Sequence, residues 1–204
     1  GVIPRYGGVV IHDCWASYLA YDHCGHGLCG SHLLRELVFI IDANGYVWAT
    51  NMKRLLQETC AIVAKRKRKN LTRNEYKNLQ KRYRNILTRG GKELPPIPPR
   101  QNGKRGRIAK SGAHNLWGRM KQYEEAVLLF ARESHVSFTN NWAERDLRMI
   151  KVKQKVSGCF RTNKYAEAYC RISSYLQTMA NQGYNPLVAI QLALSGQTYA
   201  DTGE

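Results

Sequence analysis

A carboxylate embedded in positive charge stands out in the segment from Phe138 to Ile150. Glu144 is followed there by Arg145 and Arg148, and further cations come directly after this segment: Lys151, Lys153 and Lys155. A carboxylate among fixed cations is suited to holding a divalent metal ion against a phosphate group. The first chemistry that the sequence suggests is therefore metal-assisted reaction of a phosphate ester.

A second acid in a favourable position is Asp13. The β-branched run at residues 8–11 predicts a short strand and places Asp13 at its carboxyl end. In open α/β sheets, active-site side chains collect at that edge. Several glutamates fall instead on predicted helix surfaces, where a solvated charge is the expected role: Glu58, Glu75, Glu124, Glu125 and Glu133.

The charge of the chain points to a polyanionic partner. Lys and Arg number 32 against 15 acids, so the formal net charge is +17. Such a balance favours nucleic acid through counterion release, and an anionic membrane surface is the weaker interpretation. Three clusters are candidates for contact with a phosphate backbone: Lys65, Arg66, Lys67, Arg68 and Lys69 in the first, Lys104, Arg105 and Arg107 in the second, and Lys151, Lys153 and Lys155 in the third. For the first cluster, the alternative is a solvated helix face.

The composition also indicates the class of protein. With 43% hydrophobic residues, the 204 residues can bury a real core. No run approaches the roughly 20 apolar residues that cross a bilayer, and the first residues show no signal-peptide pattern. We therefore expect a globular cytoplasmic protein and, because Gly1 is not an initiator methionine, a piece of a longer one.

Six cysteines are spread along the chain without the density of a disulfide scaffold, so we expect reduced thiols. Cys24, His26, Cys29 and His32 lie within nine positions and could close a zinc site. Their short spacing departs from the usual finger pattern, which has a second, distant pair of ligands. The alternative is packing and hydrogen bonding at a turn between a strand and a helix.

Helical periodicity dominates most of the remaining chain. We expect helices over residues 31–41, over residues 46–63, and from a capping box at residues 72–75 onward to residue 87. A further helix is expected over residues 113–133. Proline and glycine interrupt residues 94–110, which predicts an exposed basic connector.

Shorter helices are expected at both ends of the chain. Trp15, Tyr18, Leu19 and Tyr21 have helical spacing after Asp13. Another helix should begin near Asn140 or Asn141, which are good N-caps, and should turn three apolar residues inward: Ala143, Leu147 and Ile150. Two amphipathic helices are predicted over residues 165–180 and 186–194.

Three stretches match, in order and spacing, the pattern of one known family. They are Val-Ile-His-Asp-Cys-Trp-Ala-Ser-Tyr at residues 10–18, Leu-Cys-Gly-Ser-His-Leu-Leu-Arg-Glu-Leu at residues 28–37, and residues 140–155 with Ser-Gly-Cys-Phe-Arg at residues 157–161. Together they resemble the transposases of the insertion sequence 66 family, and the resemblance extends through essentially the whole chain. Each stretch alone would be a weak signal, whereas the combination is highly specific.

The resemblance implies an acidic-triad transposase that uses Mg²⁺ or Mn²⁺, with two ions held when the full triad is present. Asp13 matches the second acid of the triad and Glu144 the third, so we expect the two carboxylates to approach within metal-bridging range. Arg145 and Arg148 would face the phosphate or brace the acid, or else form a surface charge pair with Asp146. Structural or DNA-positioning roles are expected for four residues: Cys29, His32, Asn140 and Asn141.

The fold that the resemblance implies is α/β, helix-rich overall, with a partial ribonuclease-H-like catalytic core. Residues 1–44 would form one part of this core and residues 137–204 another. Residues 45–136 would be a mainly helical insertion that contains the basic connector. The expected partners are DNA at the element ends and the target, a second copy of the chain on DNA, and accessory proteins of the same element, with no membrane partner. The location would be the bacterial cytoplasm, at the nucleoid.

Two departures from the family pattern affect the functional expectation. The first triad aspartate would lie on a strand before Gly1 and is absent from the 204 residues. Thr139 stands where many relatives have an aspartate. We therefore expect residues 1–204 by themselves to be catalytically inactive, and the alternative function is a catalytically inactive DNA-binding remnant of a transposase.

Overall fold

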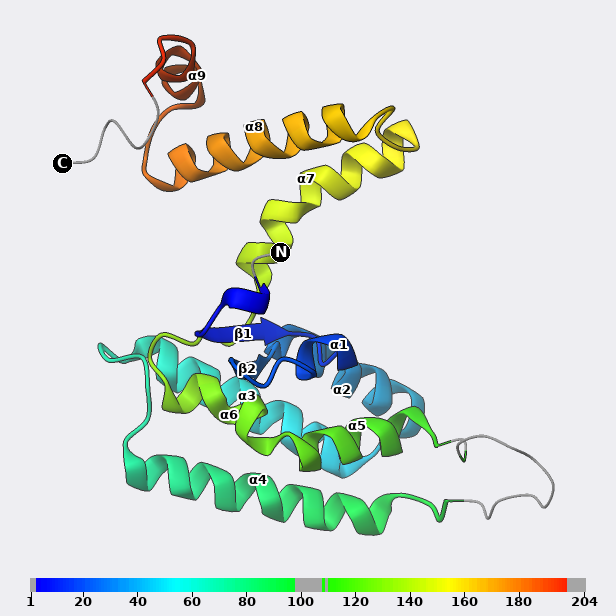
Figure 1. Ribbon diagram of the computed structural model, residues 1–204. Helices are drawn as coiled ribbons and strands as arrows, with labels where there is room; N and C mark the ends of the chain where they lie inside the picture. The colour runs from blue at the N-terminus through cyan, green and yellow to red at the C-terminus, as the bar shows by residue number, and fades with distance from the viewer. Residues whose placement is uncertain (1–2, 98–107, 109, 198–204) are drawn as a thin grey trace. The chain divides into compact units, whose positions relative to one another are not determined.

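Helices dominate the structure, a computed structural model that describes residues 3–97, 108 and 110–197. The chain divides into two compact units, Gly1–Asn140 (unit 1) and Asn141–Glu204 (unit 2). Within the described residues, the strands form one sheet of two strands (Figure 1). The prediction of a helix-rich α/β protein is confirmed at this level.

The order of the elements is simple. Unit 1 begins with a 3-10 turn, η1 (Ile3–Arg5), followed by β1 (Val9–His12), α1 (Ala16–Leu19) and β2 (Gly25–Leu28). Five helices follow: α2 (Gly30–Asn44), α3 (Val47–Lys65), α4 (Arg73–Glu93), α5 (Gly112–Gln122) and α6 (Glu124–Arg132). Unit 2 contains α7, α8 and α9, which span Asn141–Ser157, Asn163–Asn181 and Pro186–Leu194. None of the helices in the described ranges is long and apolar enough to span a bilayer.

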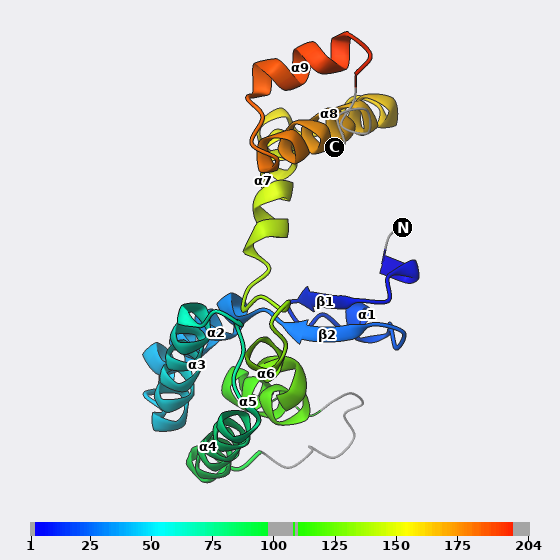
Figure 2. The same ribbon diagram turned by 90° about the vertical axis from the view of Figure 1, so that its left-hand side faces the viewer.

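Strands β1 and β2 lie side by side and run parallel, with Val9 opposite Gly25 and His12 opposite Leu28 (Figure 2). Strand β2 packs against α6. Strand β1 was predicted from the sequence, whereas β2 was not. Glycine at two of the four β2 positions gives this segment a low intrinsic strand propensity, so its pairing with β1 is what makes it a strand.

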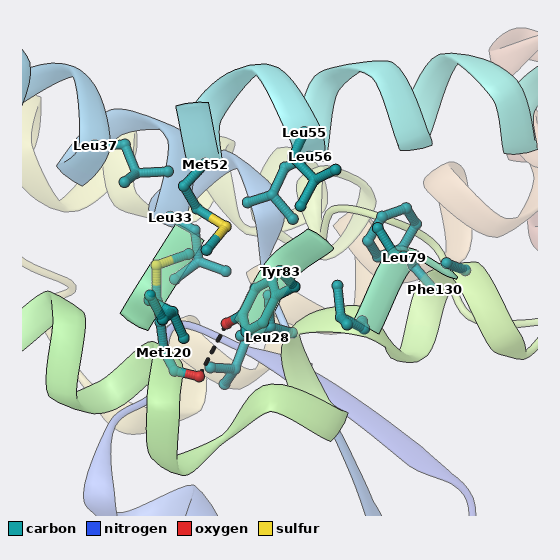
Figure 3. Packing of buried hydrophobic residues seen from close by; sticks show 14 of the residues in the cluster. Leu28, Leu33, Leu37, Met52, Leu55, Leu56, Leu79, Tyr83, Met120 and Phe130 are labelled. Carbon is teal, nitrogen blue, oxygen red and sulfur yellow. Dashed lines mark hydrogen bonds between the residues drawn. The ribbon is translucent and has the colours of Figure 1, made fainter. Parts of the chain in front are cut away.

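The core of unit 1 lies between helices α2 to α6 (Figure 3). Leu37, Met52 and Leu56 are fully buried there. The buried Tyr83 hydroxyl donates a hydrogen bond of 2.9 Å to the backbone carbonyl of Met120, which satisfies both polar groups. Burial raises the pKa of Tyr83 far above its usual value, so the hydroxyl remains protonated and stays a donor.

Two glycines in the last turns of α4 have a packing reason. A Cβ built on Gly90 would lie 2.6 Å from Cγ of Trp48, and one on Gly91 would lie 3.1 Å from the Trp117 ring. Glycine costs about 1 kcal/mol relative to alanine within a helix. In α4 that cost is offset because the missing side chains let the buried Trp48 lie directly against the helix backbone.

Of two helix boundaries predicted for unit 1, one is confirmed and one is wrong. The capping box of α4 is confirmed, since the Thr72 side chain accepts from the Glu75 backbone and Glu75 accepts from Thr72. The single helix predicted over residues 113–133 is wrong. Tyr123 has φ −112° and ψ 36°, which ends α5 and begins α6.

Unit 2 has little core of its own. Among its described residues, Met179 and Ala189 are the buried hydrophobic ones. Its helices begin at strong local signals, since Thr162 caps α8 and Asn185 caps α9 before Pro186. The prediction that α7 begins at Asn140 or Asn141 is confirmed, but the inward placement of Leu147 is wrong, because this side chain is 52% exposed.

Candidate functional site

Asp13 directly follows β1, as the sequence predicted. The next residue, Cys14, has φ +71°, so the chain turns sharply after the strand. The Trp15 backbone N–H donates a hydrogen bond of 3.3 Å to Oδ1 of Asp13. The carboxylate is thus held at the carboxyl end of a parallel strand while it remains exposed. Such a group can bind a cation or a substrate.

A chain of hydrogen bonds links this turn, through two histidines, to the Tyr21 carbonyl. The Cys14 backbone N–H donates to Nδ1 of the buried His12 at 3.1 Å. Nε2 of His12 lies 3.1 Å from Nδ1 of His26, and Nε2 of His26 lies 2.7 Å from the Tyr21 carbonyl. Because a carbonyl only accepts, these contacts fit one arrangement of neutral rings in which both Nε2 atoms donate.

Burial lowers the pKa of His12, and the neighbouring His26 lowers it further, while Asp13 acts in the opposite direction. The neutral His12 ring required by its hydrogen bonds agrees with this shift. This network cannot be recognised from the sequence, because the pairing of β1 with β2 is what brings the two histidines together.

Cys29 anchors a segment that is distant in the sequence. Its thiol is buried at the start of α2, and the Asn140 backbone N–H donates to Sγ at 3.5 Å. The Gly30 N–H donates to the Phe138 carbonyl at 2.7 Å, and a Cβ on Gly30 would lie 2.2 Å from the Phe138 ring. These contacts fix the chain one residue before α7 begins. His32 follows one turn after Cys29 on α2.

The proposed zinc ligands do not gather into one site. Cys24 Sγ donates to the Tyr21 carbonyl, and His26 bonds to Tyr21 and His12, whereas Cys29 accepts from Asn140. In the described parts of the chain, no three of Cys24, His26, Cys29 and His32 have ligand atoms within coordinating range of one another. Hydrogen bonds account for Cys24 and His26, whereas ligand atoms of Cys29 and His32 lie within 4.8 Å of each other.

Glu144 lies in the first turn of α7, in unit 2, whereas Asp13 belongs to unit 1. Their approach to a common metal site stays a prediction. The Arg145 guanidinium lies 4.6 Å from the centre of the Trp142 ring, a cation–π contact. The other predicted cations of this helix are exposed: Arg148, Lys151, Lys153 and Lys155.

The first basic cluster forms the turn between α3 and α4, and its members differ in their contacts. Arg66 makes two hydrogen bonds to the Glu75 carboxylate, at 2.8 and 2.5 Å. Lys69 has φ +53°, and its ammonium group donates to the Ala64 carbonyl near the end of α3. Three cations of the cluster are exposed and have no hydrogen bond or ion pair with any described residue: Lys65, Lys67 and Arg68.

Arg66, Lys67 and Arg68 line a pocket together with Asn70, Leu71 and Thr72. The arrangement can accept an anionic group beside the turn, because two of the three cations, Lys67 and Arg68, have no charged or hydrogen-bonded partner among the described residues. The second basic cluster, Lys104, Arg105 and Arg107, lies outside the described residues.

Comparison with known proteins gives one match. The family described as "Transposase IS66 family" matches residues 2–168. No curated protein and no solved structure matches the chain.

Proposed function

The chain belongs to the IS66 family of transposases, and we propose that it takes part in metal-dependent cleavage and strand transfer of DNA, with Asp13 and Glu144 as two of three catalytic acids. A transposase acts on DNA, and the net charge of +17 suits that substrate. The observation that carries the proposal is the family match over residues 2–168, a range that contains both acids. The position of Asp13 at the end of a parallel strand supports it.

The donor set fits Mg²⁺ or Mn²⁺, because carboxylate oxygens are the ligands that these hard cations prefer. Asp13 is exposed, and its backbone hydrogen bond fixes the orientation of the carboxylate. Glu144 is carried by the first turn of a helix, which limits its motion. Such ions, when bound, activate the attacking oxygen and stabilise the leaving one. The proposed framework is a ribonuclease-H-like core with helices α3 to α6 inserted between the two acids.

The cations of the α3–α4 turn would position the DNA. Lys65, Lys67 and Arg68 are available for phosphate, whereas Arg66 and Lys69 hold the turn through Glu75 and the end of α3. Contacts of this kind fix the DNA in place without reading its sequence. The exposed cations of α7 would extend the same role in unit 2.

The acids are tested by cleavage of DNA that carries the element ends, using a polypeptide that also supplies the first acid of the triad. We expect Asp13→Asn and Glu144→Gln each to abolish Mg²⁺- or Mn²⁺-dependent cleavage and to leave DNA binding intact. Asp22→Asn and Asp146→Asn, which change exposed acids within ten positions of Asp13 and Glu144 in the sequence, are the matched controls. Cleavage that survives both test substitutions overturns the proposal. DNA binding with no cleavage by the unchanged protein favours the inactive DNA-binding remnant.

The turn is tested by the salt dependence of DNA binding. Replacing Lys67 and Arg68 together by Ala should reduce the slope of log affinity against log salt by about 1.8, because each lost phosphate contact removes about 0.9. The double change of Lys77 and Lys81 to Ala on the exposed side of α4 removes the same charge elsewhere. An equal reduction in both double variants would mean that only the overall charge matters.

A further inference from the structure

The four tryptophans fall into two groups. Trp48 is buried, and the half-buried Trp117 donates its ring N–H to the Leu87 carbonyl at 2.8 Å, so both serve the core of unit 1. Trp15 and Trp142 are 66% and 64% exposed. A large aromatic ring left in water loses the burial that normally stabilises such a residue, and exposed aromatics in DNA-binding proteins serve as stacking platforms.

Each of the two exposed tryptophans is close in the sequence to one of the candidate acids. Trp15 comes two residues after Asp13, and Trp142 comes two residues before Glu144. Each exposed indole is therefore two positions from a candidate acid: Trp15 donates its backbone N–H to Asp13, whereas the spacing of Trp142 and Glu144 on α7 turns their side chains to different sides of the helix. The structure places Trp15 at the N-cap of α1, where its ring lies edge-on to Tyr18 with 6.5 Å between the ring centres and remains largely in solvent.

The surroundings of the rings favour a nucleobase as the occupant. Arg145 lies against the Trp142 ring, so a cation is available for the phosphate next to a stacked base. In a duplex both faces of a base are already covered by its neighbours. Only an unpaired or flipped base offers a free face to an aromatic side chain.

We propose that Trp15 and Trp142, each on the same chain segment as one of the two acids, bind unpaired nucleobases of the DNA, a role that rests on the proposed function. The two indoles would hold bases that have left the stack, while the cations hold the backbone. The ligand class is single-stranded or frayed DNA, and the contact is to the base rather than to the phosphate.

The experiment measures binding of the chain to three probes of equal length at one salt concentration: a single strand, its duplex, and an abasic strand with the same backbone. We expect Trp15→Ala and Trp142→Ala each to weaken binding to the single strand about 5- to 150-fold. Binding to the duplex and to the abasic strand should not change. The Phe variant at each position should restore most of the affinity, and the Leu variant should not.

The control variant is Phe39→Ala, which removes another exposed ring, 70% exposed on α2, that no candidate acid accompanies. The inference is overturned if the abasic strand and the normal strand lose affinity equally, if Leu restores binding as well as Phe, or if the substitutions change the oligomeric mass and not the affinity. An effect at one tryptophan alone upholds the role there and overturns it at the other. If the unchanged chain binds none of the probes, the proposed function fails as well.

Discussion

Unit 1 and unit 2 use their apolar residues in opposite ways. Unit 1 buries Leu37, Met52 and Leu56 completely in a continuous core, whereas the described part of unit 2 buries Met179 and Ala189 and leaves Leu187 71% exposed. Unit 1 is therefore held by its own packing. In unit 2 the helices are fixed mainly by signals at their ends, so many of its side chains are available for contacts outside the unit.

The largest difference should appear when leucines are truncated. Leu56→Ala leaves a cavity in unit 1 and should lower the free energy of unfolding by about 2–5 kcal/mol. Leu187→Ala on α9 should change it by less than about 0.5 kcal/mol. Urea unfolding curves measure both, and equal losses would remove the contrast between the units.

A matched pair of tyrosines gives a smaller effect. Tyr83 donates to the Met120 carbonyl within the core of unit 1, and Tyr175 donates to the Ala189 carbonyl at 2.8 Å in unit 2. Tyr83→Phe leaves a buried carbonyl unpaired and should cost about 1–3 kcal/mol. Tyr175→Phe should cost less, about 0.5–1 kcal/mol, because Tyr175 is itself only half-buried and its hydrogen bond is partly open to water. A larger loss at Tyr175 in thermal unfolding would show that unit 2 is the more tightly packed.

The smallest effect is expected on the stability of the fold at acidic pH. Hydrogen bonds from Arg66, and then from Thr72, lower the pKa of Glu75 from 4.5 to about 2. A carboxyl group whose pKa is lowered by folding stabilises the protein above its unfolded pKa, and that contribution is lost as the pH falls through the folded pKa. Stability should therefore decline between about pH 4.5 and 2.

Glu75→Gln should remove this part of the decline and lower stability at neutral pH. Glu167→Gln, which changes an exposed glutamate on α8 of unit 2, is the control. Acid unfolding followed by circular dichroism measures the decline. The same decline in the Glu75 variant would assign the acid sensitivity to other groups.

The sequence predicted unit 2 well where the information is local. The predicted ranges 165–180 and 186–194 correspond to α8 at Asn163–Asn181 and α9 at Pro186–Leu194. A polar N-cap and a proline at the first turn act within a few residues of themselves, so they can be recognised without knowing the fold.

The failures in unit 1 depend on contacts between distant segments. Strand β2 exists because it pairs with β1, and that pairing in turn brings His12 to His26. Asn140 reaches Cys29 across 111 positions, a contact that no local pattern reveals. For the candidate site, the sequence placed Asp13 correctly at a strand end, whereas its shared site with Glu144 remains a prediction.

The close packing of Trp48 on Gly90 has a consequence for the divergence of related sequences. Any side chain at position 90 would collide with the indole, since even a Cβ would come within 2.6 Å of it. The two positions can therefore change only in a coordinated way: the glycine can be replaced by a larger residue only after the tryptophan has been exchanged for a smaller one. In an alignment of relatives, these two columns should covary although 42 positions separate them.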